Sequence, residues 1–301
     1  MQKRVYLILV VLMFSVFLVF GCTQPATAPA QQTAAATSVP TTVTSADTVK
    51  LGDSSLGKVL TDAKGMTLYY FTTDIPSSGV STCYSAFNCS KFWPIFSVDN
   101  LVVSSPLEAS DFSSITRTDG TRHTTYYGWP LYYFQKDTKP GDVLGEGVLK
   151  TWYVAKPDYS VMITSTPKLG SYLTDGSGKT LYVFNKDSTG TSTCTGTCLA
   201  KWPAYYSAAI NAPSLLKTSD FGTVSRADGV SQSSYMGRPL YYYSGDNSPG
   251  NTNGEGFNNV WYVANITGVA PVVTTPPMTV QTTVQTLSPS GGGSSSGGGG
   301  Y

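Results

Sequence analysis

The chain has 301 residues, of which only 12% are charged, and its 19 basic and 18 acidic side chains nearly cancel. A typical soluble protein carries roughly 25% charged residues, and without a basic surface nucleic acid is excluded as a partner. The 20 tyrosines and 30 glycines are typical of an extracellular β protein, and the length suggests about two domains.

The amino terminus predicts export. Lys3 and Arg4 precede an apolar run over residues 5–20. This run is shorter than the roughly 20 residues of a membrane-spanning helix, so we predict a signal peptide over residues 1–21. Residues 19–22 resemble a prokaryotic lipobox, apart from Phe20, and the resemblance implies that Cys22 is diacylated and becomes the new amino terminus. An uncleaved signal anchor and cleavage at another position are the alternatives.

Two segments have compositions that do not favour folding. After Cys22, residues 22–49 are mainly Thr, Ala, Pro, Gln and Ser, and they bury too little apolar surface to offset the entropy of ordering. We predict a flexible stalk there. Residues 267–301 pass from Pro and Thr into Gly and Ser, which predicts a disordered tail.

The segment between stalk and tail contains an internal repeat. Residues 117–153 match residues 226–262 without a gap, so that Arg117 corresponds to Arg226 and Trp152 to Trp261. The copies extend over residues 50–158 and 165–266, and we predict that they are two separate domains. Propeller blades are the alternative arrangement.

Each copy is itself doubled into two half-units, because the element Tyr-x-aromatic-x-x-Asp occurs twice in it. We call this element the Tyr–Asp motif. Its four occurrences are Tyr69, Phe71 and Asp74; Tyr132, Phe134 and Asp137; Tyr182, Phe184 and Asp187; and Tyr241, Tyr243 and Asp246.

Alternation in these motifs predicts short strands. Tyr69 and Phe71 fall on one face of a strand, and Leu68 and Tyr70 on the other. Pairs such as Asp119-Gly120 are turn signals, and no window of a dozen residues has a helical apolar period. We therefore predict an all-β fold: two tandem copies of a small antiparallel β domain, sandwich or barrel-like.

The four cysteines beyond Cys22 fall between a Tyr–Asp motif and a Trp-Pro pair in each copy. We predict disulfides between Cys83 and Cys89 and between Cys194 and Cys198, since paired cysteines outside the membrane are usually oxidised. The spacing of the two cysteines differs between the copies, which favours a disulfide that closes a loop over a metal site, whose ligand geometry is fixed.

The motif aspartates are the most systematic polar feature of the chain. We expect each to close a strand by accepting hydrogen bonds from backbone N–H groups of the following turn. The alternative is a hard cation, with Asp137 and Glu146, or Asp246 and Glu255, as oxygen ligands.

Few residues suggest catalysis. The single histidine, His123, corresponds to Gln232 in the second copy, so we interpret it as a strand or surface residue. No nucleophile elbow or phosphate-binding loop is present, and we predict no cofactor and no enzymatic activity. Most aromatic residues alternate with Leu or Val, which favours core filling over stacking on a glycan.

Taken together, the four motifs, the cysteine pairs and the Trp-Pro pairs resemble the prokaryotic secreted-repeat lipoproteins whose function is unknown. The resemblance implies a lipid-anchored protein of the cell membrane that faces the extracellular side or the periplasm. We expect a non-enzymatic binding or structural module with an envelope protein or glycan as partner. A metal-handling or redox accessory protein and an envelope hydrolase are the alternatives.

Overall fold

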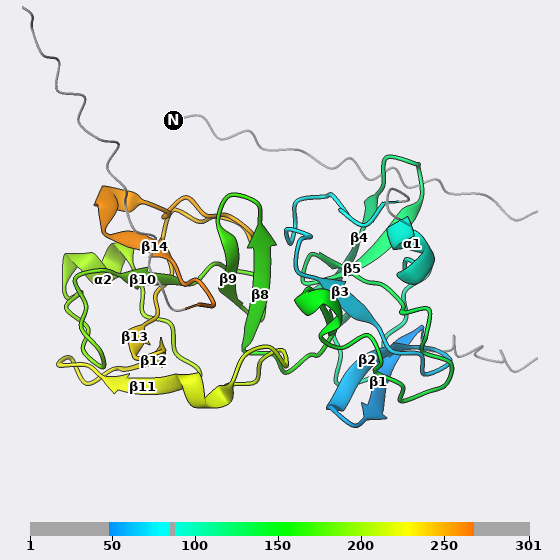
Figure 1. Cartoon of the computed structure of the whole chain (residues 1–301), viewed down its shortest axis with the longest axis horizontal. Coiled ribbons are helices and arrows are strands. Elements are labelled where there is room, and N and C mark those ends of the chain that lie inside the picture. Colours follow the sequence, from blue (N-terminus) through cyan, green and yellow to red (C-terminus); the bar gives the residue numbers. More distant parts are fainter. Residues whose placement is uncertain (1–47, 85–87, 268–301) are drawn as a thin grey trace, which may run out of the picture. The chain divides into compact units, whose positions relative to one another are not determined.

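The computed structural model describes residues 48–84 and 88–267. The described part of each copy consists of short strands, one short α-helix and 3-10 turns (Figure 1). The elements of the first copy are β1 (Val49–Ser54), β2 (Gly57–Asp62), β3 (Tyr69–Phe71), α1 (Cys89–Phe92), η2 (Ala109–Asp111), β4 (Phe112–Thr116), β5 (Arg122–Tyr126), β6 (Trp129–Pro130), η3 (Val148–Lys150) and β7 (Trp152–Val154).

The second copy repeats this order of elements. They are β8 (Val161–Thr166), β9 (Gly170–Asp175), β10 (Tyr182–Phe184), α2 (Thr197–Lys201), η4 (Thr218–Asp220), β11 (Phe221–Ser225), β12 (Ser231–Tyr235), β13 (Arg238–Pro239), η5 (Phe257–Asn259) and β14 (Trp261–Val263). All strand pairs between these elements are antiparallel, and the predicted all-β fold of repeated units is confirmed.

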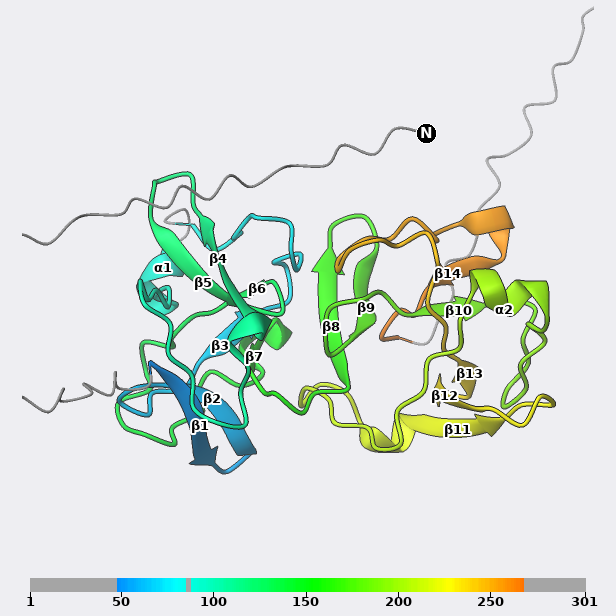
Figure 2. The same ribbon diagram turned by 180° about the vertical axis from the view of Figure 1, so that it is seen from behind.

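Hairpins supply most of the strand pairs. β1 pairs with β2, and β4 with β5, as Figure 2 shows from the reverse side. The second hairpin turns at Gly120, whose φ of 79° lies in the left-handed region that glycine adopts without steric cost. The pair of β3 with β7 is different, because it joins the first half-unit to the last strand of the second.

The period of two places successive residues of the motif strand in separate parts of the core. Tyr69 belongs to a buried cluster with Trp93 and Trp152, whereas Leu68 belongs to a second cluster with Phe96 and Leu131. Tyr69, Leu68 and Trp152 are at most 2% exposed. The predicted alternation therefore matches the two faces of the strand.

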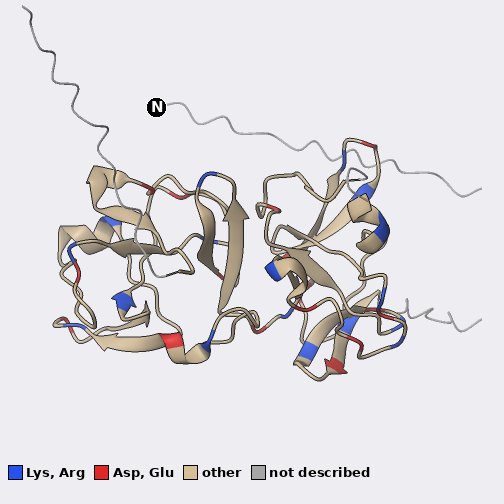
Figure 3. Ribbon diagram, in the orientation of Figure 1, with Lys and Arg blue, Asp and Glu red and all other residues tan. Residues whose placement is uncertain are grey.

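Several predictions concern residues outside the described part. The signal peptide, Cys22, nearly all of the stalk and the tail from residue 268 onward are among them. β1 begins at Val49, which is fully buried, so the last residue of the predicted stalk is already part of the fold. Within residues 48–84 and 88–267, no helix has the length and apolarity needed to cross a membrane. Charged residues are few and of mixed sign along the ribbon (Figure 3).

Candidate functional site

The two motif tyrosines of each copy lie side by side, where its two half-units meet. The backbone N–H of Tyr69 donates to the carbonyl of Tyr132 at 2.8 Å, and the N–H of Tyr132 donates back at 2.9 Å. Tyr182 and Tyr241 exchange the same two bonds at 2.8 and 2.9 Å. This reciprocal bridge brings the two half-units of each copy together at their motifs.

The phenols of these tyrosines bind the aspartate of the other half-unit. Tyr69 donates to Asp137 at 2.6 Å, and Tyr132 donates to Asp74 at 2.5 Å. In the second copy, the pairs Tyr182–Asp246 and Tyr241–Asp187 have the same crossed arrangement, both at 2.6 Å. Each Tyr–Asp motif is thus completed by the motif of its partner half-unit.

Backbone N–H groups of the following loop supply the second donor to each aspartate. Thr82 donates to Asp74 at 2.6 Å and Leu144 to Asp137 at 3.0 Å. The corresponding donors are Thr193 for Asp187 and Asn253 for Asp246. The expected backbone bonds are therefore present, but the donors lie six to eight residues beyond each aspartate, farther than in an Asx-turn.

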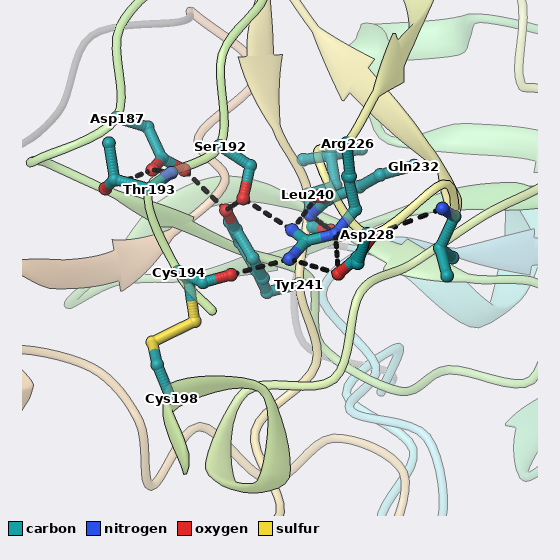
Figure 4. A network of polar contacts seen from close by, with 11 residues as sticks. Asp187, Ser192, Thr193, Cys194, Cys198, Arg226, Asp228, Gln232, Leu240 and Tyr241 are labelled. Atoms are coloured by element: carbon teal, nitrogen blue, oxygen red, sulfur yellow. Dashed lines mark hydrogen bonds and ion pairs between the residues drawn. A yellow bond between two sulfur atoms is a disulfide. The ribbon is translucent and has the colours of Figure 1, made fainter. Parts of the chain in front are cut away.

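A buried arginine extends one of the two Tyr–Asp pairs in each copy. In the second copy, Arg226 donates to Ser192, whose hydroxyl lies 2.7 Å from that of Tyr241 (Figure 4). The same guanidinium donates to the carbonyl of Cys194 at 2.6 Å and pairs with Asp228 at 3.0 Å. Arg226 is 7% exposed, so its charge is held by protein groups.

The first copy repeats the network with one exchange. Arg117 donates to Ser81 at 2.6 Å and to the carbonyl of Cys83 at 2.9 Å.

Burial raises the pKa of Asp74 to about 6, although hydrogen bonds from Thr82 and Tyr132 oppose the rise. Burial also raises the pKa of Asp137 and of Asp246.

The exchange is at His123, which takes the place of Gln232. Nε2 of His123 lies 2.7 Å from the carbonyl oxygen of Leu131, and the Gln232 amide donates to the carbonyl of Leu240 at the same distance. The side chain of His123 is fully buried, and its burial lowers its pKa to about 4. His123 is therefore a buried residue of β5, and the alternative of a surface histidine is wrong.

Beside this polar network, four aromatic rings form a continuous stack. Phe71 lies on Trp152 at 4.1 Å between centroids, Trp152 on Trp93 at 3.8 Å, and Trp93 on Phe134 at 4.4 Å. Phe184, Trp261, Trp202 and Tyr243 form the equivalent stack in the second copy, with the same three separations. The third motif position therefore supplies the two end rings of each stack.

An apolar cavity of about 540 Å³ opens beside the stack of the first copy. Its lining includes the four stacked rings, together with Val148 and Lys136. Two further lining residues are exposed apolar side chains: Phe92 is 45% exposed and Leu149 is 83% exposed. Thr82, Cys89 and Thr151 complete the lining, and we call this space the aromatic cavity. Its volume is within the range of small-molecule sites, roughly 300–1,000 Å³.

Both predicted disulfides are confirmed. Cys83 bonds to Cys89, and Cys194 to Cys198. Cys89 begins α1 and also lines the aromatic cavity. The first disulfide thus fastens the loop that carries Thr82, a donor to Asp74, to the helix that carries Phe92.

The carboxylates considered as cation ligands bind backbone groups. Glu146 accepts from the N–H of Val154 at 2.8 Å, and Glu255 from the N–H of Val263 at 2.7 Å. Asp137 and Asp246 accept from the tyrosines described above. In the part of the chain that the structure describes, no group of three or more His, Cys, Asp or Glu side chains could hold a metal ion.

These features define a class of protein: a tandem all-β repeat, stapled by disulfides, in which paired half-units complete each other's motifs. The chain matches the family described as a secreted repeat of unknown function at residues 50–97, 113–156, 163–205 and 222–265. These four segments are the four half-units, and they cover more than half of the chain, which therefore belongs to this family. No curated protein and no solved structure matches it.

Sequence reasoning missed three parts of the site, although signals for them exist. Ser81-Thr82-Cys83 recurs as Ser192-Thr193-Cys194, which could have indicated the donors around the aspartates. The second part is the buried arginine, which the correspondence of Arg117 with Arg226 could have indicated. The third part is the aromatic cavity, whose signal is a difference between the copies and not a shared motif.

Proposed function

We propose that this secreted repeat protein is a non-enzymatic binding module of the cell envelope, with its ligand site in the aromatic cavity of the first copy. The observation that carries the proposal is the exposure of Phe92 and Leu149 at a cavity with an aromatic lining. Exposed apolar side chains that gather at a concave site mark ligand or partner sites more often than scattered ones do.

The polar network supports binding over catalysis. The four motif aspartates accept hydrogen bonds from tyrosines and backbone groups, and Asp74 is fully buried. A carboxylate that acts on a substrate needs free access to it, and here these oxygens serve the fold. The network instead positions the aromatic stack, because the Tyr–Asp motif carries both the bonded aspartate and an end ring.

Attachment to the membrane through a diacylated Cys22 is part of this proposal. The lipobox-like segment and the secreted family support it. The test is mass spectrometry of the protein from the envelope fraction, which should find a diacylglyceryl group on an amino-terminal Cys22. Detection of a peptide that retains Met1 would contradict it.

A thermal-shift screen of the purified chain tests the binding function. A ligand that binds the folded state raises the midpoint by mass action, by about 2.7 kcal/mol of stability at a hundredfold excess over Kd. The screen covers glycans, small aromatic and aliphatic acids, and metal ions. A ligand whose shift disappears in Val148→Phe would support the cavity as the site, whereas shifts that all survive this change would refute it.

A further inference from the structure

The two copies differ where the aromatic cavity opens. Phe257 takes the place of Val148, Lys201 the place of Phe92, and Asn258 the place of Leu149. The ring stack beneath these positions is unchanged in its spacing. The stack therefore keeps its geometry, although Tyr243 replaces Phe134 at one end, and the apolar residues that cover it differ between the copies.

In the second copy, a side chain of the chain itself covers the stack. The ring of Phe257 contacts Trp202 at 5.7 Å and Tyr243 at 5.8 Å between centroids. The ammonium of Lys201 lies over the same ring, 4.1 Å from its centroid. The equivalents of Phe257, Trp202 and Tyr243 in the first copy are Val148, Trp93 and Phe134, and all three line the open cavity.

The two copies place different side chains on the same left-handed backbone conformation at the cavity. Leu149 has a φ of 54° and is 83% exposed, while its counterpart Asn258 has a φ of 52°. Asparagine tolerates this left-handed conformation, whereas a leucine there is strained and exposes its apolar side chain to water. Folding alone therefore favours the asparagine, and the exposed leucine adds apolar surface to the rim of the cavity.

One positively charged side chain lines the open cavity. It is Lys136, whose counterpart in the second copy is the uncharged Gly245. In the second copy the ammonium at this place belongs to Lys201 and lies over the ring of Phe257. A ligand that places an aromatic ring beside the stack of the first copy would therefore meet the ammonium group of Lys136.

Resting on the binding function proposed above, we infer that the first copy binds a small-molecule aryl carboxylate, and that Phe257 closes the second copy by occupying the equivalent space. The phenyl ring of Phe257 shows which ligand shape the ring stack accepts. Lys136, which lines the cavity, favours a carboxylate on that ring.

The test is isothermal titration calorimetry of the purified full chain with 3-phenylpropionate. The wild-type chain should bind one equivalent. Phe257→Val opens the second copy and should give two equivalents. Val148→Phe should give none, and so should the double change Phe92→Lys with Val148→Phe, which reproduces the second copy and guards against misfolding of the single variant. An unchanged stoichiometry in all three variants would overturn the inference.

Four further titrations identify which parts of the ligand are recognised. Leu149→Asn should weaken binding by about tenfold through lost apolar contact, and Lys136→Gln by about two- to fivefold because an exposed charge contributes little. Phenethylammonium should bind more weakly than 3-phenylpropionate. If 3-cyclohexylpropionate binds as tightly and Val148→Phe still removes it, the aromatic ligand is wrong while the binding function stands. If no probe binds the wild-type chain and the screen above finds no cavity ligand, both fail.

Discussion

The phenol of Tyr69 donates its hydrogen bond to Asp137, at 2.6 Å, and not to Asp74, the aspartate of its own motif. Asp74 is bonded instead by Tyr132, the tyrosine of the other half-unit. A half-unit alone would leave a buried aspartate without its tyrosine and a buried tyrosine without its aspartate. Because unsatisfied buried polar groups are costly, the half-units should fold only as a pair.

A double-mutant cycle tests this crossed pairing. Tyr69→Phe should cost about 1.5–3 kcal/mol, the usual contribution of a buried hydrogen bond to a charged group. Combined with Asp137→Asn, it should show a coupling energy of about 1–2 kcal/mol in urea unfolding. The matched control pairs Tyr69→Phe with Asp74→Asn, whose effects should add within about 0.5 kcal/mol. Stronger coupling to Asp74 than to Asp137 would contradict the arrangement.

The exchange of His123 for Gln232 makes a second prediction. Nδ1 of His123 has no hydrogen-bond partner among the described residues, whereas the Gln232 amide oxygen accepts from Arg226 at 2.8 Å. His123→Gln should give Arg117 the same acceptor and raise the free energy of unfolding by about 1 kcal/mol at pH 7. Loss of stability in this variant would show that the two copies hold their arginines differently.

Acidification should change the free energy of unfolding in opposite directions through His123 and Asp74. Between the ordinary pKa of about 6.5 and the folded pKa of about 4, the histidine binds a proton only when unfolded, so falling pH destabilises the fold. Asp74, whose folded pKa is about 6, holds a proton in the folded state between pH 6 and 4, so falling pH stabilises it. Each effect is about 3 kcal/mol, and they oppose each other over nearly the same window.

Single substitutions separate the two effects. In urea unfolding at pH 7 and pH 4, the stability of His123→Gln relative to wild type should increase on acidification, since the destabilising histidine is gone. The stability of Asp74→Asn relative to wild type should decrease on acidification. Equal pH profiles for wild type and His123→Gln would show that His123 titrates alike in the folded and unfolded chain. The nearby charges Arg117 and Asp119 remain in both proteins.

A glycine next to the motif pair supports a fourth prediction. A Cβ on Gly145 would lie 2.7 Å from Cε1 of Tyr69 and 2.8 Å from Cη2 of Trp93, both buried rings. Gly145→Ala should therefore cost about 1–3 kcal/mol in urea unfolding, because a shift of either ring would disturb the Tyr69–Asp137 hydrogen bond or the stacking of Trp93. Gly222→Ala is the control: its Cβ would lie 3.2 Å from a serine hydroxyl, and the change should stay within about 0.5 kcal/mol. Equal effects of the two changes would exclude the steric explanation.

The fold was largely predictable, since four motifs with period-two alternation and turn signals between them leave little choice but short antiparallel strands. The disulfides followed from the cysteine spacing. The crossed Tyr–Asp pairing did not, because each copy offers a motif tyrosine two chemically identical aspartates. The reciprocal backbone bridge between Tyr69 and Tyr132, set by tertiary packing, brings each phenol to the aspartate of the other half-unit.

The aromatic cavity was hidden for a different reason. A repeat is recognised by what its copies share, and the ring stack is shared. The cavity arises from residues that differ between the copies, such as Val148 in the first copy where the second has Phe257. A valine in place of a phenylalanine can mean a repacked core or an open site, and the sequence does not distinguish these because the surrounding volume is set by the fold.

Leu149 provides the fifth prediction, a separation of stability from binding. Leu149→Asn replaces an exposed leucine at a φ of 54° by the residue that the second copy has in the same conformation. The free energy of unfolding should rise by about 1 kcal/mol, since asparagine tolerates the left-handed region better. Asn258→Leu in the second copy is the matched reverse change and should lower it by a similar amount. In urea unfolding, a loss of stability in Leu149→Asn would mean that the leucine serves the fold and would remove the strain argument for a ligand at the cavity.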